Sequence, residues 1–191
     1  MIAVVEQHRP GPGSRQAARL GGHVPSIDTR RLQLRGPRIY DFGAFAAILC
    51  SDRAEYMGGP LSRPEAWAEF ANYTALWMLH GHGLWTIDCQ FGPSCGFVLL
   101  GYEYDDPEAE LGVFLTEEAE GQGFAQEAAE AVRSYAFDTL KWESVVSYVD
   151  ASNTRCVALM ERLGAFRDAQ SEAALGRGTL VFRHVPAGGG A

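Results

Sequence analysis

The sequence contains no apolar run that approaches the roughly 20 residues needed to span a membrane. Its first residues, MIAVVEQHRPGPGSR, lack a basic segment followed by an apolar core, so we expect no signal peptide and a cytoplasmic location. Basic residues are in the minority, because the net charge is −8 and the isoelectric point is near 5.1. These features argue against a membrane partner and against nucleic-acid binding, which usually needs a basic face.

The cysteines also lack the spacing of a metal site. The chain has four, at Cys50, Cys89, Cys95 and Cys156, with no CxxC pair and no Cys/His cluster at zinc spacing. We therefore expect no bound metal, and four free buried thiols in a reducing compartment.

What the chain does have is enough apolar material for one folded domain, with 47% hydrophobic residues among 191. Residues 1–26 are rich in Gly, Pro and Arg and show no periodicity, which predicts a flexible arm. The domain is expected to span residues 27–186, and the sequence AGGGA predicts a flexible tail over residues 187–191.

Apolar periodicity and turn residues predict an ordered series of helices and strands. Asp41 is expected to cap one helix, and Ser62 with Glu65 has the capping-box spacing of the next. The predicted order is strand 31–35, a helix after Asp41, helix 62–79, strands 84–89, 95–104 and 109–115, helix 124–140, strand 144–149, helix 153–163, and strands 166–169 and 179–184.

The central stretch runs from a strand into a glycine turn and then into a helix. The strand ends at Leu115, an acidic loop follows, and the turn Gly121-Gln122-Gly123 leads into a helix that begins near Phe124. Glycines allow close backbone approach, and the first N–H groups of a helix have no internal partner. The stretch therefore predicts a cradle for an anion.

Two motifs carry a family resemblance. Residues 115–128, LTEEAEGQGFAQEA, contain a pattern similar to G-x-G-[YF]-A-x-E-A, and residues 153–165, NTRCVALMERLGA, resemble N-x-x-S-x-x-x-x-E-[KR]-L-G. Both patterns are typical of the RimJ/RimL-like branch of the GNAT (Gcn5-related) N-acetyltransferases. The resemblance covers about residues 29–186, and the two motifs occur in the family's order and spacing.

The resemblance implies an α+β (α/β) fold, the GNAT fold. Its central sheet is mixed but mostly antiparallel, with about seven strands, a splayed cofactor wedge and about four flanking helices. Gly112, inside the strand that borders the wedge, is expected to mark a bulge that opens it.

The resemblance also implies acetyl-CoA as co-substrate. Its pantetheine arm would lie between strands 111–115 and 144–149, with the backbone of Val113 and Leu115 pairing with its amides. The amide near Val113 or Phe114 would stabilise the developing oxyanion. The remaining cofactor-binding residues implied by the resemblance are Gly121, Gln122, Gly123, Phe124 and Ala125 for the pyrophosphate, Asn153 for the pantetheine, and Arg155 for a phosphate.

Acetyl transfer to an amine requires a base, for which Glu110 is the first candidate and Glu103 the second. Either carboxylate is equally compatible with a solvated strand end. Cys156 replaces the branch's usual Ser, near a helix N-terminus that can lower a thiol pKa. It either donates a proton to the leaving sulfur or packs as an inert residue. Met160 stands where many members carry a Tyr acid, so the acid is unassigned.

These features predict an N-acetyltransferase that moves an acetyl group from acetyl-CoA to a primary amine, either a protein N-terminus or a small molecule. The amine would attack directly in a ternary complex, in a monomer or homodimer. The alternative is a non-catalytic acyl-CoA-binding sensor, since Met160 cannot donate a proton and the cradle loop carries Glu117, Glu118 and Glu120. That acidic loop predicts weak, salt-insensitive CoA binding. Candidate walls of the acceptor site are Tyr56, Trp85, Tyr102 and Tyr104.

Overall fold

One sheet runs through the computed structural model, which describes residues 2–175 and 178–186. The sheet has eight strands in the order β1-β2-β3-β4-β5-β6-β8-β7, and its one parallel pair is β5 with β6. The strands are β1 (Ile27–Asp28), β2 (Gln33–Arg35), β3 (Leu84–Cys89), β4 (Gly92–Gly101), β5 (Glu110–Leu115), β6 (Val145–Asp150), β7 (Phe166–Arg167) and β8 (Thr179–His184). The predicted mixed, mostly antiparallel sheet is confirmed, and β1 is the strand beyond the predicted seven.

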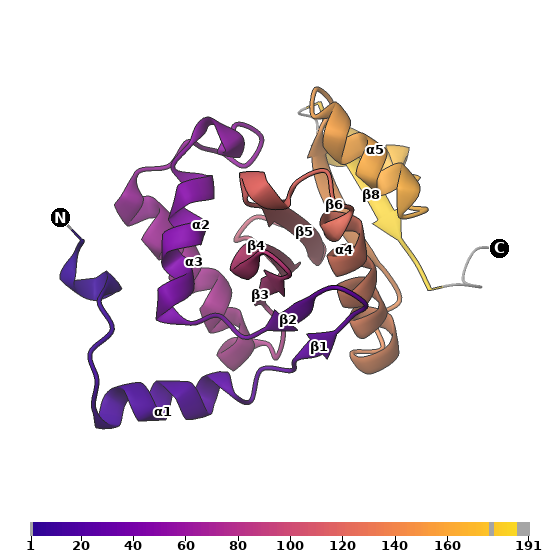
Figure 1. Cartoon of the computed structure of the whole chain (residues 1–191). Coiled ribbons are helices and arrows are strands. Elements are labelled where there is room, and N and C mark those ends of the chain that lie inside the picture. The colour runs from indigo at the N-terminus through magenta and orange to yellow at the C-terminus, as the bar shows by residue number, and fades with distance from the viewer. Residues whose placement is uncertain (1, 176–177, 187–191) are drawn as a thin grey trace.

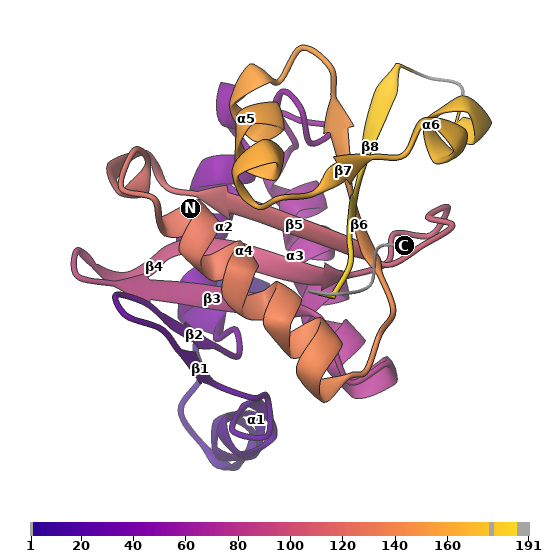
Figure 2. The same ribbon diagram turned by 90° about the vertical axis from the view of Figure 1, so that its right-hand side faces the viewer.

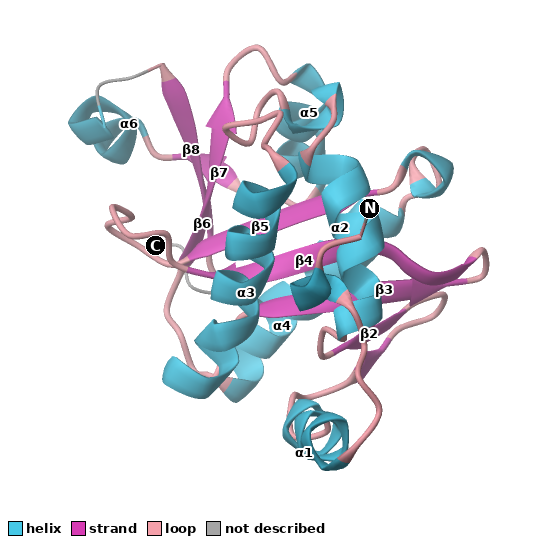
Figure 3. Cartoon of the chain, turned by 90° about the vertical axis from the view of Figure 1, so that its left-hand side faces the viewer, coloured by secondary structure: helices cyan, strands magenta, loops and turns pink. Residues whose placement is uncertain are grey.

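Helices cover both faces of this sheet (Figure 1). The α-helices are α1 (Pro12–Gly21), α2 (Phe42–Leu49), α3 (Arg63–Leu79), α4 (Phe124–Ser134), α5 (Thr154–Arg162) and α6 (Ala169–Leu175). Helix α4 crosses one face, as Figure 2 shows, and α2 and α3 lie on the other face, as Figure 3 shows. Small buried residues of α4, such as Ala128 and Ala129, allow the helix to pack closely on the sheet. On the other face Phe45, Phe70 and Phe97 form the centre of an aromatic core.

Local capping signals gave mixed results. The capping box of α3 is confirmed, with the Ser62 N–H donating to Glu65 Oε2 at 2.8 Å and the Glu65 N–H donating to Ser62 Oγ at 3.4 Å. The predicted cap at Asp41 is wrong, because its side chain makes no cap hydrogen bond. Asp41 instead accepts bonds of 2.7 and 3.0 Å from Arg35, which is buried and needs a counterion.

The N-terminal arm contains two short helices, the 3-10 helix η1 (Val4–Glu6) and α1, neither of which has a buried residue. Glu6 anchors η1 to α3, accepting bonds of 2.9 and 2.6 Å from the Arg63 guanidinium. Helix α6 was not predicted either. The N–H groups of Gln170 and Ser171 donate to Asp168, which fixes its first turn. The predicted tail at 187–191 lies outside the described residues.

Cys89 and Cys95 form a disulfide with Cα atoms 6.1 Å apart. The prediction of four free thiols is therefore wrong for this pair and holds for Cys50 and Cys156. The bond joins the end of β3 to β4. The two strands form a hairpin in which Cys89 pairs with Gly92, so Cys95 of β4 returns along β3 and comes close to Cys89. A spacing of six residues does not reveal this pairing without the register.

The predicted helix 124–140 changes geometry partway. Helix α4 ends at Ser134 and continues as a π-helical turn, η5 (Tyr135–Thr139). Lys141, the one lysine of the chain, follows with a φ of 60° and an exposed side chain. No helix in the described part of the chain is long and apolar enough to cross a membrane.

Candidate active site

The wedge lies where β5 and β6 part. In the described structure these parallel strands pair at one position, Glu110 with Val146, and the Ser147 hydroxyl donates to the Leu111 carbonyl at 2.6 Å just beyond it. Figure 2 shows β6 and β8 rising away from the direction of β3, β4 and β5. Strand β4 pairs with the other edge of β5 over its full length, so the edge from Val113 to Leu115 is left without a partner strand. An amide-bearing ligand can add to such an edge through backbone hydrogen bonds.

The closed end of the wedge is held by an ion-pair network. Arg183 of β8 donates to both carboxylate oxygens of Glu108, at 2.6 and 2.7 Å, just before β5 begins. The same guanidinium contacts Asp168 at 2.7 Å. Because Arg183 is largely buried, these contacts fix the angle between β8 and β5 more firmly than an exposed pair would.

The bulge predicted at Gly112 is absent from the β4–β5 ladder, whose register is unbroken from Glu110 to Leu115. A register shift occurs instead between Ile87 and Cys89, on the β3–β4 ladder. The wedge therefore opens because β6 turns away from β5, and Gly112 simply faces Leu99 across a regular pair.

The glycine cradle has the predicted backbone geometry. Gly121 and Gly123 have φ values of 71° and 78°, a left-handed conformation that favours glycine. Gly123 is the N-cap residue of α4 and supplies no side-chain cap, so the first N–H groups of the helix remain available to an anion. Phe124 is fully buried and fixes the start of the helix, while Gln122 is exposed.

Arg31 fastens this cradle to the start of the domain, and sequence reasoning missed it. Its Nη1 donates to the Gln122 carbonyl at 2.7 Å and its Nε to Glu127 Oε2 at 2.7 Å. The guanidinium also lies over the Phe124 ring, 4.8 Å from its centroid. The Thr29 hydroxyl adds a 2.6 Å bond to Glu127 Oε1. The Glu of the first motif was visible in the sequence, but its partners lie almost a hundred residues away.

Glu120, at the end of the acidic loop, is bridged by two arginines. Arg155 Nη1 donates to its Oε2 at 3.0 Å, and Arg53 Nη2 donates to its Oε1. Arg155 was expected to reach a phosphate, and its side chain is 76% exposed. Arg53, which also donates to the Leu115 carbonyl at 3.4 Å, is a second missed residue. Arg53 of η3 (Asp52–Ala54) and Arg155 of α5 therefore bring two positive charges beside the cradle, and the single carboxylate of Glu120 offsets one of them.

Glu110 lies at the apex of the wedge and is half-buried. Burial raises its pKa to about 8, and the carboxylates of Asp106 and Glu103 add to the shift. Glu103, the second candidate base, is exposed and accepts a 2.7 Å bond from the Tyr73 hydroxyl. A carboxyl whose pKa is raised to near neutrality has the properties of a general base, so the raised pKa and the position at the wedge favour Glu110 over the exposed Glu103.

Cys156 lies in the first turn of α5, where its N–H donates to Asn153 Oδ1 at 3.1 Å. This bond makes Asn153 the cap of the helix, a role for which Ser152 was the other candidate, and it leaves the Nδ2 hydrogens of Asn153 to donate elsewhere. Burial and the charge of Glu110 raise the pKa of Cys156 to about 11, so the expected lowering by the helix N-terminus is wrong. The thiol stays protonated at neutral pH. The fold thus brings Cys156 within electrostatic reach of Glu110.

Two aromatic residues near the site differ from expectation. Trp85, a predicted acceptor wall, is fully buried in the core, with its Nε1 donating to the Pro25 carbonyl at 2.8 Å. Tyr148 of β6 was missed: its buried hydroxyl has no hydrogen-bond partner among the described residues. Burial, followed by the carboxylates of Asp106, Glu108 and Glu110, raises the pKa of Tyr148 to about 12, so its side chain is a neutral phenol near the candidate base Glu110.

The splayed parallel pair, the glycine cradle and the order of strands define an acetyltransferase of the GNAT type. The acetyltransferase (GNAT) domain family matches residues 31–165, and the chain belongs to this family. Among solved structures, an acetyltransferase from Agrobacterium tumefaciens str. C58 is 36% identical, with a TM-score of 0.77 over 84% of this chain and 94% of that one.

Two more distant structures share the fold and were solved with cofactor. The ribosomal L7/L12 alpha-N-protein acetyltransferase RimL, in complex with CoA, is 17% identical, with a TM-score of 0.67 over 84% of this chain and 98% of that one. The microcin C7 self-immunity acetyltransferase MccE, in complex with acetyl-CoA and AMP, is 13% identical, with a TM-score of 0.66 over 82% of this chain and 93% of that one.

Proposed function

We propose that this protein transfers the acetyl group of acetyl-CoA to a primary amine, by direct attack of the amine on the thioester in a ternary complex. The observation that carries the proposal is the convergence of Glu110, with its raised pKa, and the unpaired edge of β5 at one wedge. The family match and the CoA complexes of two structural neighbours support acetyl-CoA as the donor.

Each implied residue has a role that its position supports. The backbone of Val113, Phe114 and Leu115 would bind the pantetheine amides and the oxyanion, since that edge of β5 has no partner strand. The amides of residues 121–125 would hold the pyrophosphate at the start of α4. Asn153 would donate its Nδ2 hydrogens to the pantetheine, because its Oδ1 is used by the cap. No step requires a metal.

Glu110 would take one proton from the acceptor ammonium, and the resulting neutral amine would attack the thioester, so that the acetyl group passes from sulfur to nitrogen. The second proton that the nitrogen loses would return to the group that protonates the leaving thiolate. The leaving CoA thiolate then needs a proton, which the neutral Cys156 thiol or the Tyr148 phenol can supply. A thiol that remains protonated is a poor nucleophile, so we propose that no acetyl-cysteine intermediate forms.

The acceptor is either a protein N-terminus or a small-molecule amine. RimL is named for the first kind of acceptor, and the MccE structure holds AMP beside acetyl-CoA. We further propose that the transferase domain spans residues 27–186 and works in the cytoplasm as a monomer or homodimer. The family match over residues 31–165 lies within these bounds. The Cys89–Cys95 disulfide is of a kind that reducing compartments disfavour, which counts against the cytoplasm.

The test is a thiol-release assay with acetyl-CoA and a panel of small amines and N-terminal peptides. Release that depends on both acceptor and Glu110 supports transfer. Measurable CoA binding without release for any acceptor contradicts it and supports the sensor alternative, which the buried Met160 and the Glu120 bridge favour. Mass spectrometry of the acceptor identifies the acetylated nitrogen and so separates the two acceptor classes.

A further inference from the structure

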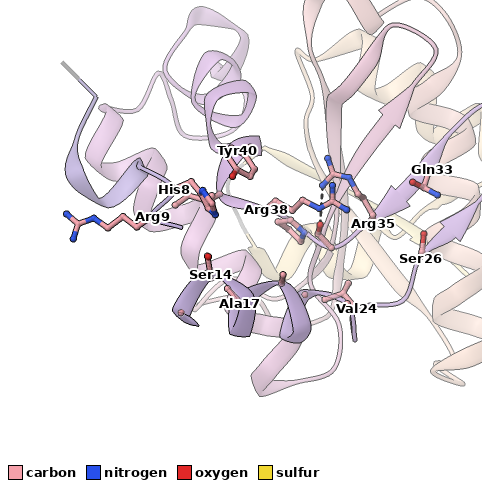
Figure 4. A pocket seen from close by; sticks show the side chains of 17 residues that line it. His8, Arg9, Ser14, Ala17, Val24, Ser26, Gln33, Arg35, Arg38 and Tyr40 are labelled. Carbon is pink, nitrogen blue, oxygen red and sulfur yellow. Dashed lines mark hydrogen bonds between the residues drawn. The ribbon is translucent and has the colours of Figure 1, made fainter. Parts of the chain in front are cut away.

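A cavity of about 800 Å³ lies between α1 and strand β2, near one end of the sheet (Figure 4). It is separate from the wedge, because β2 and the parting pair β5 and β6 are divided by β3 and β4 in the sheet order. Its volume falls within the range of about 300–1,000 Å³ that is typical of small-molecule pockets. Nothing in the proposed transfer reaction uses it.

The cavity exists because the N-terminal arm is anchored at both ends and bridges the space between. At one end Glu6 pairs with Arg63, and His8 packs on the Tyr40 ring with centroids 5.0 Å apart. At the other end Val24 packs against Gly36, where an added Cβ would lie 2.9 Å from the Val24 Cβ.

Between these anchors, α1 faces the cavity with small side chains, among them Ser14, Ala17 and Ala18. Ala17 and Ala18 are exposed, so this space is open to solvent. The arm is therefore held over a space that its own side chains are too small to fill.

The charge of the lining is opposite to that of the molecule. No aspartate or glutamate lines the cavity among the described residues, although the chain has 24 of them and a net charge of −8. The basic lining residues are His8, Arg9, Arg35 and Arg38. Arg35 is neutralised by Asp41 and Asp88, at 2.7 Å each.

Arg38 supplies the unneutralised charge. Its side chain forms no ion pair within the described residues, and Figure 4 shows it beside Arg35 at the inner end of the cavity, whereas Arg9 extends outward. The backbone N–H of Arg38 donates to Asp41 Oδ2 at 2.7 Å, and this bond does not involve the guanidinium. The apolar lining residues include Val24, Pro37 and Ile39.

We propose that this cavity binds a small amphipathic anion. Its carboxylate, sulfonate or phosphate would pair with the Arg38 guanidinium, and its apolar or aromatic body would lie between α1 and the residues Val24, Pro37 and Ile39. A guanidinium binds such planar or tetrahedral oxyanions through paired N–H donors. The apolar body would fill the space that the small residues of α1 leave open.

The test uses two dyes that differ by one charged group, 1-anilinonaphthalene-8-sulfonate and the uncharged N-phenyl-1-naphthylamine, with the full-length protein. The sulfonate is expected to bind saturably at one site and to fluoresce more strongly. Arg38→Gln keeps the backbone bond to Asp41 and should weaken sulfonate binding about tenfold, as expected for loss of a charge-assisted contact, with little effect on the uncharged dye. Arg19→Gln, on α1 but outside the cavity lining, is the matched control and should bind like the wild type.

Cavity filling locates the site. Ala17→Trp should abolish binding of both dyes. Saturating acetyl-CoA should leave dye binding by the wild-type protein unchanged, because the wedge is separate from the cavity. Ala17 is exposed in a surface helix, so the variant should fold, and a matched thermal unfolding curve checks this. If acetyl-CoA displaces the sulfonate dye, or if Ala17→Trp binds the dyes as well as the wild type does, the proposal that they bind in this cavity is wrong. If Arg38→Gln binds the sulfonate as well as Arg19→Gln does, the proposal that Arg38 pairs with an anion is wrong, whatever the result with Ala17→Trp.

Discussion

Glu110 stands where β5 and β6 make their one parallel pairing, with a pKa raised to about 8 by burial and by Asp106 and Glu103. A group with this pKa becomes a competent base as the pH passes about 8. We expect kcat/KM to rise between about pH 7 and pH 9, and Glu110→Gln to abolish that rise and lower kcat/KM by about 10²–10⁴-fold. Glu103→Gln, measured with the same amine, is the control and should keep most of the rise. A Glu110→Gln profile identical to the wild type would remove Glu110 from catalysis.

The same residue should limit stability at high pH. The folded pKa of Glu110 lies above its ordinary value of 4.5, so folding favours the protonated form. Its contribution to stability is therefore complete below about pH 4.5 and is lost as the pH rises through about 8. Glu110→Gln should unfold at a higher Tm than the wild type at pH 9, by about 2–4 °C for each 1 kcal/mol relieved, and at a similar Tm at pH 5. Differential scanning calorimetry at both pH values decides this, and a Tm that falls at pH 9 contradicts the buried charge.

Glu120 reduces the positive charge that lies beside the cradle. Its carboxylate pairs with both Arg53 and Arg155, and such partly exposed pairs contribute only about 0.2–1 kcal/mol each to stability. Glu120→Gln should release both arginines and tighten CoA binding about threefold to tenfold, with a steeper salt dependence. Isothermal titration at low and high salt measures both effects. Glu118→Gln removes a loop charge that forms no ion pair in the described chain, and tightening equal to that of Glu120→Gln would show that net charge alone matters.

At the scale of elements, one residue at the start of α5, Asn153, caps the helix and is also proposed to bind the cofactor. Asn153 accepts the Cys156 N–H through Oδ1, and its Nδ2 hydrogens are the donors proposed for the pantetheine. Asn153→Asp keeps the cap acceptor and removes the donors, whereas Asn153→Ala removes both. We expect the Ala variant to lose about 1 kcal/mol of stability and the Asp variant to lose little. Both should raise the KM for acetyl-CoA. An Asp variant with a normal KM would assign Asn153 to capping alone.

The elements that the sequence predicted well are those specified by short-range patterns. The capping box of Ser62, the cap at Asn153 and the turn before Phe124 each depend on residues within one helical turn. The resemblance supplied the wedge, which periodicity does not reveal. Asp41 has a good capping residue type, but a buried arginine from a neighbouring strand offered it a stronger partner.

The residues that sequence reasoning missed are joined by long-range contacts. Arg31 and Glu127 are 96 residues apart, and Arg53 and Glu120 are 67 residues apart. These pairs form only when the helices and loops that carry them are brought together by the tertiary fold, which the local spacing of residues in the sequence does not specify. The same is true of the Cys89–Cys95 disulfide, whose two thiols meet only when the hairpin register is set.

At the scale of the whole molecule, the wedge separates the β6–β8 layer from the rest of the sheet, joined along β5 at one paired position in the described structure. A cofactor that binds both borders should therefore stabilise the whole fold. Acetyl-CoA at about 100 times its Kd should add about 2.7 kcal/mol, which corresponds to a Tm increase of roughly 5–10 °C for a domain of this size. Scanning fluorimetry measures the increase. Arg38→Gln, remote from the wedge, should show the same increase, and a missing increase in the wild type would contradict a preformed site.

Lys141 makes the surface of the molecule unusual in its content of primary amines. It is the one lysine of the chain, exposed after the π-helical turn, while every other basic side chain apart from histidine is an arginine. Arginine stays protonated and offers no free amine to a thioester. A GNAT acetyltransferase that acts on amines, as proposed above, would therefore present a single lysine side chain as a target in place of its substrate. Acetyl label on acceptor proteins would accordingly be assigned with little background from the enzyme itself, and an amine-reactive dye would mark two sites, Lys141 and the α-amino group of the chain.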